Sequence, residues 1–312
     1  MALSKESTPQ NGTSVHALSD LPFVDAHHHL WDLSACHYPW LMARGEKRFF
    51  GDPTPIQRDY LPANFLSESI RYKPTQSVHI QVGVAIEDEV RETTWLSSLG
   101  DFPHAIVAST DLTGPNRDRL LEQHGAFPKV RGIRQILGRH PVEDRKHNSD
   151  RMIDNDEFRA GLQELVRRDL SFDLQLIPQQ MIRVADLLSD LPALRVALCH
   201  CGSPWEQTGE GLRLWRAGLA RLAELPNVVC KISGLGMFNP EWSGAAFEPI
   251  IHEVIDRFGP QRVMCGSNFP VDKLYASYDR LWNAYRVALS RYSTEEQRQM
   301  LAVTAKNFYR LD

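Results

Sequence analysis

The sequence predicts a single barrel of eight parallel strands, each followed by a helix, which is the (β/α)8 or TIM-barrel fold. Its 312 residues suit one such barrel, which takes about 250 residues plus extensions. Eight short runs rich in valine and isoleucine alternate with longer stretches of helical periodicity. The short runs are apolar throughout, as expected of parallel strands that are buried on both faces.

The elements can be placed in chain order from these runs. The strands are expected at residues 21–26, 77–83, 104–110, 129–137, 171–177, 194–200, 227–234 and 261–267. The helices are expected at residues 63–71, 87–99, 117–124, 155–168, 179–190, 212–225, 245–258, 278–289 and 294–311. An open doubly wound sheet would usually show a glycine-rich phosphate turn after its first strand, and "DAHHHLWD" stands there instead. We therefore expect one barrel domain over residues 21–312, after a disordered N-terminal tail over residues 1–20.

Composition and charge narrow the class of protein. Apolar residues make up 42% of the chain and charged residues 24%, which suits a large folded core. The formal net charge of −4 is small and spread out, so neither nucleic acid nor a membrane surface is expected as a partner. No apolar run is long enough for a transmembrane helix, and the five cysteines lack disulfide spacing. These features predict a cytoplasmic protein that acts on a small molecule, and they leave its oligomeric state open.

Histidines gather at two predicted strand ends, where the active sites of such barrels lie. The first strand ends in His27, His28 and His29, and the sixth ends in His200. Because successive residues of a strand point to opposite faces, His27 and His29 should face one centre, with His28 in a structural or rim position. A lone histidine is more often a core or surface residue. Three imidazoles at two strand ends favour a catalytic role for His27, His29 and His200, or a metal site made by the same three residues.

Two cations and two aromatic residues are candidates for substrate binding. Arg134 ends the fourth strand, where it would hold a ligand carboxylate or pair with Glu87 at the start of the next helix. Lys231 in the seventh strand would hold a second anionic group or support the core through an ion pair. Trp40 and Tyr60 lie in the long first loop, where aromatic side chains either wall an organic substrate or cap the barrel.

Two other segments favour structural interpretations. Cys199 and Cys201 flank His200 and should point away from its face, so packing roles are more plausible than a zinc or redox site. The charged loop over residues 138–156 is either a lid over the barrel mouth or a solvated surface loop, and its His140 is a weak candidate only.

Seven motifs follow one another in an order that resembles the amidohydrolase-related superfamily. They are "DAHHHLW", "YPW", "DYLP", "GIR", "HCGSP", "KISGL" and "GSNFP", and they span about residues 21–312. Within that superfamily the chain is most similar to lactone hydrolases that include sugar-acid lactonases and 2-pyrone-4,6-dicarboxylate lactonase. The resemblance implies a distorted TIM barrel, with His27 and His29 as the first-strand pair and His200 as the strand-six histidine. It also implies that Arg134 contacts a substrate carboxylate or carbonyl.

The main departure from the family pattern is Asn268, which stands where the family usually has an aspartate. That aspartate is the expected general base or metal-linked carboxylate, and an amide cannot take up a proton at neutral pH. Loss of a general base typically costs about 10²- to 10⁴-fold in rate. The bridging lysine and the further histidine of binuclear members are also missing from strands four and five, so a two-metal site is not expected.

Three explanations of Asn268 remain open. Asp272, Glu87 or neutral His200 could supply the base. Alternatively, one zinc ion on His27, His29 and His200 would lower the pKa of its bound water, with Asn268 positioning that water. In the third explanation, hydrolysis is lost and the pocket binds or isomerises a ligand.

The function predicted from these residues is hydrolysis of a small carboxylated or sugar-acid lactone. Arg134 would orient the substrate, and the three histidines would polarise the ring carbonyl either directly or through one divalent ion such as zinc. Catalysis with and without metal is equally compatible with the sequence. Two alternatives are a zinc-dependent decarboxylase of the same superfamily and a catalytically silent ligand-binding barrel.

Overall fold

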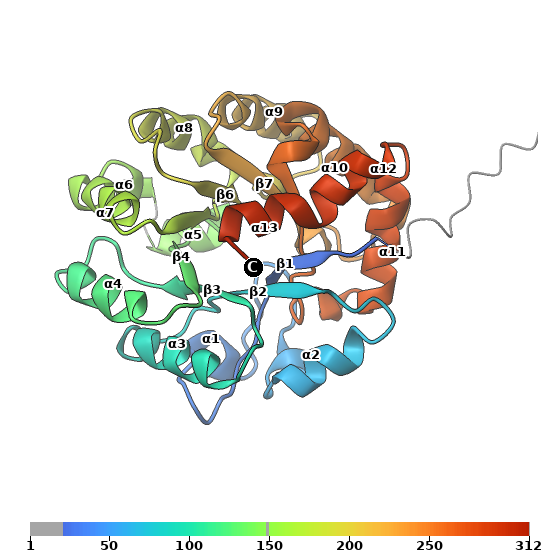
Figure 1. The fold of residues 1–312 in the computed structure, drawn as a ribbon. Helices are drawn as coiled ribbons and strands as arrows, with labels where there is room; N and C mark the ends of the chain where they lie inside the picture. The colour runs from blue at the N-terminus through green and yellow to red at the C-terminus, as the bar shows by residue number, and fades with distance from the viewer. Residues whose placement is uncertain (1–20, 148–149, 312) are drawn as a thin grey trace, which may run out of the picture.

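Eight parallel strands form one sheet that curves into a barrel (Figure 1). The computed structural model describes residues 21–147 and 150–311, so the predicted tail over residues 1–20 lies outside the described residues. Each strand pairs with the next one in sequence, from first to last. The strands are β1 (Val24–His28), β2 (Gln76–Ile80), β3 (Ala105–Ser109), β4 (Val130–Arg134), β5 (Ser171–Leu174), β6 (Val196–Leu198), β7 (Val228–Ile232) and β8 (Val263–Cys265). The (β/α)8 fold predicted from the sequence is therefore confirmed.

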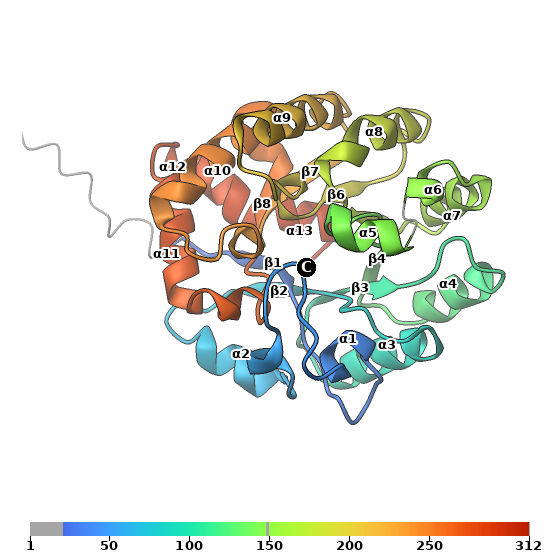
Figure 2. The ribbon, with the colours of Figure 1, turned by 180° about the vertical axis from the view of Figure 1, so that it is seen from behind.

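Helices surround the strands, and two helices lie over the ends of the barrel. The α-helices of the described residues are α1 (Pro39–Met42), α2 (Pro62–Glu68), α3 (Glu89–Ser98), α4 (Arg117–Gly125), α5 (Pro141–His147), α6 (Asp150–Ile153), α7 (Asp156–Arg167), α8 (Met181–Ser189), α9 (Gly209–Ala223), α10 (Gly244–Phe258), α11 (Tyr278–Leu289), α12 (Thr294–Arg298) and α13 (Thr304–Tyr309). A short π-helical segment, Gln299–Val303, divides the predicted final helix into α12 and α13. In Figure 1 α13 lies across one end of the barrel, and in Figure 2 α5 lies toward the opposite end.

The predicted loop over residues 138–156 is partly helical. It contains α5 and α6, two short helices that the sequence analysis did not predict. The side chain of Asp144 accepts hydrogen bonds from the backbone N–H groups of Arg139 and His140 at the start of α5. These bonds satisfy donors that would otherwise be free at a helix start, so the charged sequence supports a helix here.

The seam between the first and last strands closes just beyond their carboxyl ends. The backbone N–H of Asn268 donates to the carbonyl of His27 at 2.7 Å, and that of His29 donates to the carbonyl of Phe269 at 2.7 Å. Buried Asp25 in β1 accepts bonds from the Ser267 N–H at 2.8 Å and the Tyr278 hydroxyl at 3.0 Å. The seam therefore holds the residues after β8 directly against the histidines of β1.

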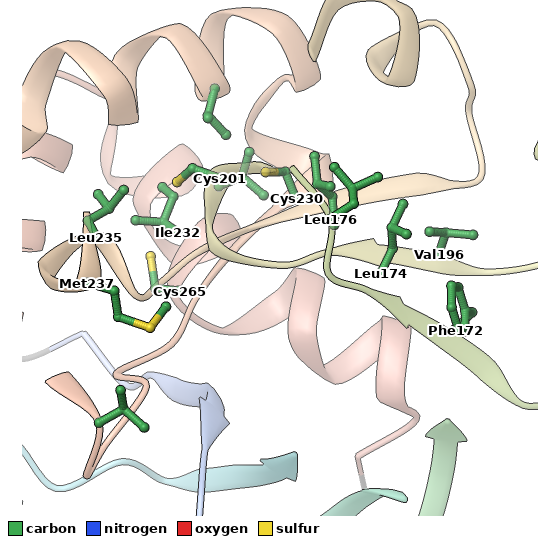
Figure 3. Close-up of a cluster of buried hydrophobic side chains, with 14 of the residues drawn as sticks. Phe172, Leu174, Leu176, Val196, Cys201, Cys230, Ile232, Leu235, Met237 and Cys265 are labelled. Carbon is green, nitrogen blue, oxygen red and sulfur yellow. The ribbon is translucent and has the colours of Figure 1, made fainter. Parts of the chain in front are cut away.

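The strand side chains contribute to two apolar layers. Those that face outward pack under the helices, and Figure 3 shows part of this layer with Cys201, Cys230 and Cys265 among leucine and isoleucine side chains. The inward-facing side chains form a second cluster that includes Val24, Val107 and residues of α13. All five cysteines are buried and free, as expected for packing residues. No helix of the described residues is long and apolar enough to cross a membrane.

Candidate active site

A cavity of about 720 Å³ lies at the carboxyl ends of the strands. Four of the residues predicted from strand ends line it together, although they come from four different strands: His29, Arg134, His200 and Asn268. Trp40 from the long first loop also lines the cavity, and its indole N–H donates to the Val82 carbonyl at 2.5 Å. The position of the cavity agrees with the general rule for barrel enzymes.

The three histidines predicted to share a centre do lie together. The ring centroid of His27 is 5.1 Å from that of His29 and 4.6 Å from that of His200. His28 points the other way, and its ring centroid lies 4.5 Å from that of Phe65 and 5.4 Å from that of Phe102. The alternation of side chains along β1 thus produces the predicted separation, with His28 in the core.

Two residues that line the cavity, His200 and Asn268, have an unusual backbone conformation. His200 and Asn268 have φ angles of 55° and 56°, a left-handed conformation that costs energy in residues other than glycine. Gly234 leaves space for the imidazole of His200, because a β-carbon at this position would lie 2.4 Å from Nδ1. Strained backbone of this kind is concentrated at functional sites, which supports the assignment of this region as the site.

Burial keeps the clustered imidazoles neutral. The pKa of His29 is lowered to about 3, first by burial and then by the nearby positive charge of Arg134. The pKa values of His27 and His200 are also lowered well below the usual value, again mainly by burial. Neutral imidazoles offer lone pairs to a proton or a metal ion, as either chemistry requires.

The hydrogen bonds of His29 determine how Asn268 is oriented. Nδ1 of His29 lies 2.7 Å from the carbonyl oxygen of Ile80, which can only accept, so Nδ1 bears the proton and Nε2 is an acceptor. Nε2 lies 3.1 Å from Oδ1 of Asn268, and the NH₂ group of Asn268 donates to the Asp272 carboxyl at 3.1 Å. Because Nε2 and Oδ1 are both acceptors when Nδ1 bears the proton, we infer that the amide turns over beside a neutral His29, so that the Asp272 carboxyl donates to it. Burial raises the pKa of Asp272 to about 7, which favours this protonated form.

The histidines have the donor chemistry of a metal site but not its arrangement. Both ring nitrogens of His27 are buried without a partner, and Nδ1 of His29 and of His200 is held by Ile80 and Ser233 respectively. Hydrogen bonds of this kind typically orient metal-binding histidines. Within the described residues, however, no three His, Cys, Asp or Glu side chains are placed to hold one ion.

Arg134 is a buried cation that has no carboxylate partner among the residues that the structure describes. Its guanidinium group donates to the Gln175 side chain at 3.1 Å and to the carbonyl of Gln81, while Nε has no partner. The predicted ion pair between Arg134 and Glu87 does not form: Glu87 is exposed and lies outside the cavity. An anionic or carbonyl oxygen in the cavity would therefore meet an available, fixed donor.

His27 is fully buried and does not line the cavity, and three other predicted residues also lie outside the lining. Lys231 is fully buried, and its ammonium group is 2.5 Å from Asp173 and 2.9 Å from the Ala26 carbonyl. It thus forms the ion pair that was one of its two predicted roles, and it has no route to a substrate. Tyr60 is also buried, where its hydroxyl donates to Glu68 at 2.9 Å. Asp272 is behind Asn268 rather than at the cavity surface.

Several residues of the cavity were not singled out from the sequence, among them Glu89 and Arg139. Glu89, two positions after the predicted Glu87, lines the cavity and accepts a bond from Ser109 at 3.1 Å. Burial raises its pKa to about 7. Arg139 also lines the cavity, five residues beyond Arg134. Both residues lie close in sequence to a predicted strand end, which was the signal that could have identified them. Which residue of a loop points into the cavity, however, depends on the turn geometry after that strand.

Comparison with known proteins agrees with this architecture. A family model described as Amidohydrolase matches residues 24–311. An uncharacterised protein, y4mH of Sinorhizobium fredii, is 38% identical over 94% of this chain and 100% of its own. An L-fucono-1,5-lactonase of Burkholderia multivorans is 31% identical over 92% of this chain and 96% of its own. The crystal structure of an amidohydrolase from Burkholderia multivorans with bound zinc is 28% identical, with a TM-score of 0.79, over 93% of this chain and 100% of that one.

Proposed function

This chain is a member of the amidohydrolase family, and we propose that it opens a small sugar-acid or carboxylated lactone by adding water to the ring carbonyl. The main support is the convergence of Arg134, His200 and Asn268 on one cavity at the strand ends. The relative described as an L-fucono-1,5-lactonase, which aligns along nearly its whole length, supports the same reaction class.

In the proposed reaction Arg134 stabilises the charge that develops on the carbonyl oxygen. Its buried position and fixed hydrogen bonds hold the guanidinium group in place before the substrate arrives, so little reorganisation is needed. Water adds to the carbonyl carbon, the bond from this carbon to the ring oxygen breaks, and the ring oxygen leaves as a hydroxyl after taking up a proton. The product is the open hydroxy acid.

His200 is the proposed proton acceptor for the attacking water. Its Nδ1 is 3.0 Å from the Ser233 hydroxyl, so Nε2 can accept when Nδ1 bears the proton. Asn268 lines the same cavity and is proposed to position the water, whereas Asp272 is proposed to orient Asn268. Glu87 is exposed and does not line the cavity, so it is given no role in the proposed reaction.

The proposal can be tested by hydrolysis assays on the purified protein. L-fucono-1,5-lactone and carboxylated lactones should be opened, and His200→Asn should lower kcat by about 10²- to 10⁴-fold. A matched change at a distant histidine, His252→Gln, should leave kcat unchanged, because His252 contacts Ala288 and Arg291 away from the cavity. Samples stripped with a chelator and reloaded with zinc would separate the metal-dependent and metal-free alternatives.

Three results would contradict lactone hydrolysis. The first would be that no lactone is opened with or without zinc. The second would be the release of carbon dioxide from aromatic acids, and the third would be full activity in His200→Asn. Recovery of a tightly bound ligand in unchanged form would favour the silent-barrel alternative.

A further inference from the structure

The cavity contains a second arginine that forms no ion pair among the described residues. Arg139 is half-buried and lines the cavity together with Arg134. Within residues 21–147 and 150–311, its guanidinium group forms no hydrogen bond, although the charges of Glu143 and Asp144 nearby favour its protonated form. A partly buried charge is costly unless something pairs with it, so an anionic ligand in the cavity would find an available guanidinium group here.

The backbone of Arg139 is held in place, which argues against a merely mobile surface side chain. Its N–H donates to both carboxylate oxygens of Asp144, at 2.9 and 3.0 Å. The N–H of the preceding Gly138 donates to the Gln175 carbonyl at 3.2 Å. The Gln175 side chain in turn accepts from Arg134, so Gln175, just beyond β5, holds both Arg134 and the residue before Arg139. The held backbone limits where the Arg139 side chain can reach, which lowers the entropy lost when its guanidinium group binds an anion.

The carboxylates around Arg139 already have other partners. Glu143 accepts from the Arg48 side chain at 3.0 Å and from the Phe49 N–H at 3.0 Å. Asp144 accepts the backbone donors described above. Burial and the positive charge of Arg48 together lower the pKa of Arg139 to about 10, consistent with a cation in unfavourable surroundings.

Two acidic residues of the cavity are also engaged elsewhere. Glu89 accepts from Ser109, while one oxygen of Asp111 accepts from Thr113 and from Gln135. Neither of them forms an ion pair with Arg139. The cavity thus offers an unpaired guanidinium group to any ligand that reaches it.

We propose that Arg139 binds a free carboxylate of the substrate, away from the lactone carbonyl that Arg134 contacts. Arg139 would then be the residue that selects acidic lactones over neutral ones. The inference rests on the proposed lactone hydrolysis and gives its substrate class: a sugar lactone that retains a second acidic group. A planar guanidinium group can bind both oxygens of a carboxylate in parallel.

A matched pair of lactones tests the proposal. D-glucaro-1,4-lactone carries a carboxylate where D-glucono-1,4-lactone carries a hydroxymethyl group. We expect the protein to show a kcat/KM about 10- to 100-fold higher for the acidic lactone. Arg139→Gln should remove this preference while changing kcat/KM for the neutral lactone by less than about threefold. Arg139→Lys should keep part of it, and Arg119→Gln, an exposed change outside the cavity, should keep all of it.

Equal activity on both lactones, or a preference that survives Arg139→Gln, would overturn the proposal. Failure of the proposed reaction would be recognised separately, because calorimetric titration with D-glucarate measures binding without turnover. Glucarate that binds the unmodified protein, and binds Arg139→Gln at least tenfold more weakly, would support the acidic subsite even if no lactone is opened. Equal binding, or no binding to either protein, would refute it.

Discussion

Replacing Lys231 with methionine should destabilise the protein strongly, because Lys231 is half of an ion pair sealed inside the barrel. Its ammonium group lies 2.5 Å from the Asp173 carboxylate, and both side chains are completely buried. The Tyr309 hydroxyl, from the helix that covers this end of the barrel, also lies 2.9 Å from each carboxylate oxygen. Lys231→Met keeps the apolar stem in place but removes the charge.

The size of the expected stability loss follows from the carboxylate that Lys231→Met leaves unpaired. In Lys231→Met the Asp173 carboxylate would remain buried with one phenol as its main partner, and an uncompensated charge of this kind costs about 3–5 kcal/mol. Proteins unfold with a free energy of about 5–15 kcal/mol, so about a fifth or more of the stability should be lost. Urea unfolding at pH 7, followed by far-UV circular dichroism, would measure this loss as a lower midpoint at unchanged slope.

A double-mutant cycle provides the control. Asp173→Asn alone should also destabilise, because it leaves the lysine charge buried, whereas the double variant leaves no unpaired charge. The loss in the double variant should therefore be smaller than the sum of the two single losses. A loss below about 1 kcal/mol in Lys231→Met, together with a large increase in KM for an acidic lactone, would refute this argument. It would restore the substrate-binding role that was the other interpretation of the sequence.

Two further predictions concern buried carboxyl groups. Burial raises the pKa of Glu92 from 4.5 to about 8, so between these pH values the folded state holds a proton that the unfolded state releases. The free energy of unfolding should therefore fall as the pH rises from about 4.5 to 8. Glu92→Gln should make this fall less steep by up to about 1.4 kcal/mol per pH unit. Urea unfolding of the variant and the unmodified protein at pH 5.5 and 7.5 would measure the fall in each. Equal falls in the two proteins would contradict the prediction. Asp272→Asn should keep lactone hydrolysis within about threefold, because a protonated carboxyl and an amide can both donate to Asn268. A fall of about 10²-fold or more in kcat would instead identify Asp272 as the general base.

The strands and the centre of the site could be predicted because they depend on local patterns. A strand buried on both faces must be apolar along its length, which makes β1 to β8 visible in the sequence. A parallel barrel brings all carboxyl ends to one rim, so His29, Arg134, His200 and Asn268 had to meet there once the strands were placed. Alternation along β1 then separated His28 from its neighbours.

The roles of the charged residues were harder to predict, because pairing depends on distances that the sequence does not contain. Lys231 and Asp173 lie on different strands, and only the barrel register shows that they meet. Glu87 and Glu89 both lie at the predicted start of one helix, yet only the second lines the cavity. The segment that holds Arg139 was predicted to be either a lid or a solvated loop, because α5, which begins with Pro141, is mostly polar.

The exchange of aspartate for Asn268 can be understood only together with Asp272. An aspartate at position 268 would place its carboxyl about 3 Å from that of Asp272, and two carboxylates so close cannot both ionise. With asparagine in the orientation inferred for a neutral His29, the Asp272 hydroxyl would donate to the amide oxygen and the amide NH₂ would donate to Nε2 of His29, whose Nδ1 donates to the Ile80 carbonyl. Each contact would then be satisfied with every group neutral, as burial favours. The sequence shows two residues four positions apart, whereas the structure shows their direct contact, through which Asp272 would hold Asn268 against His29.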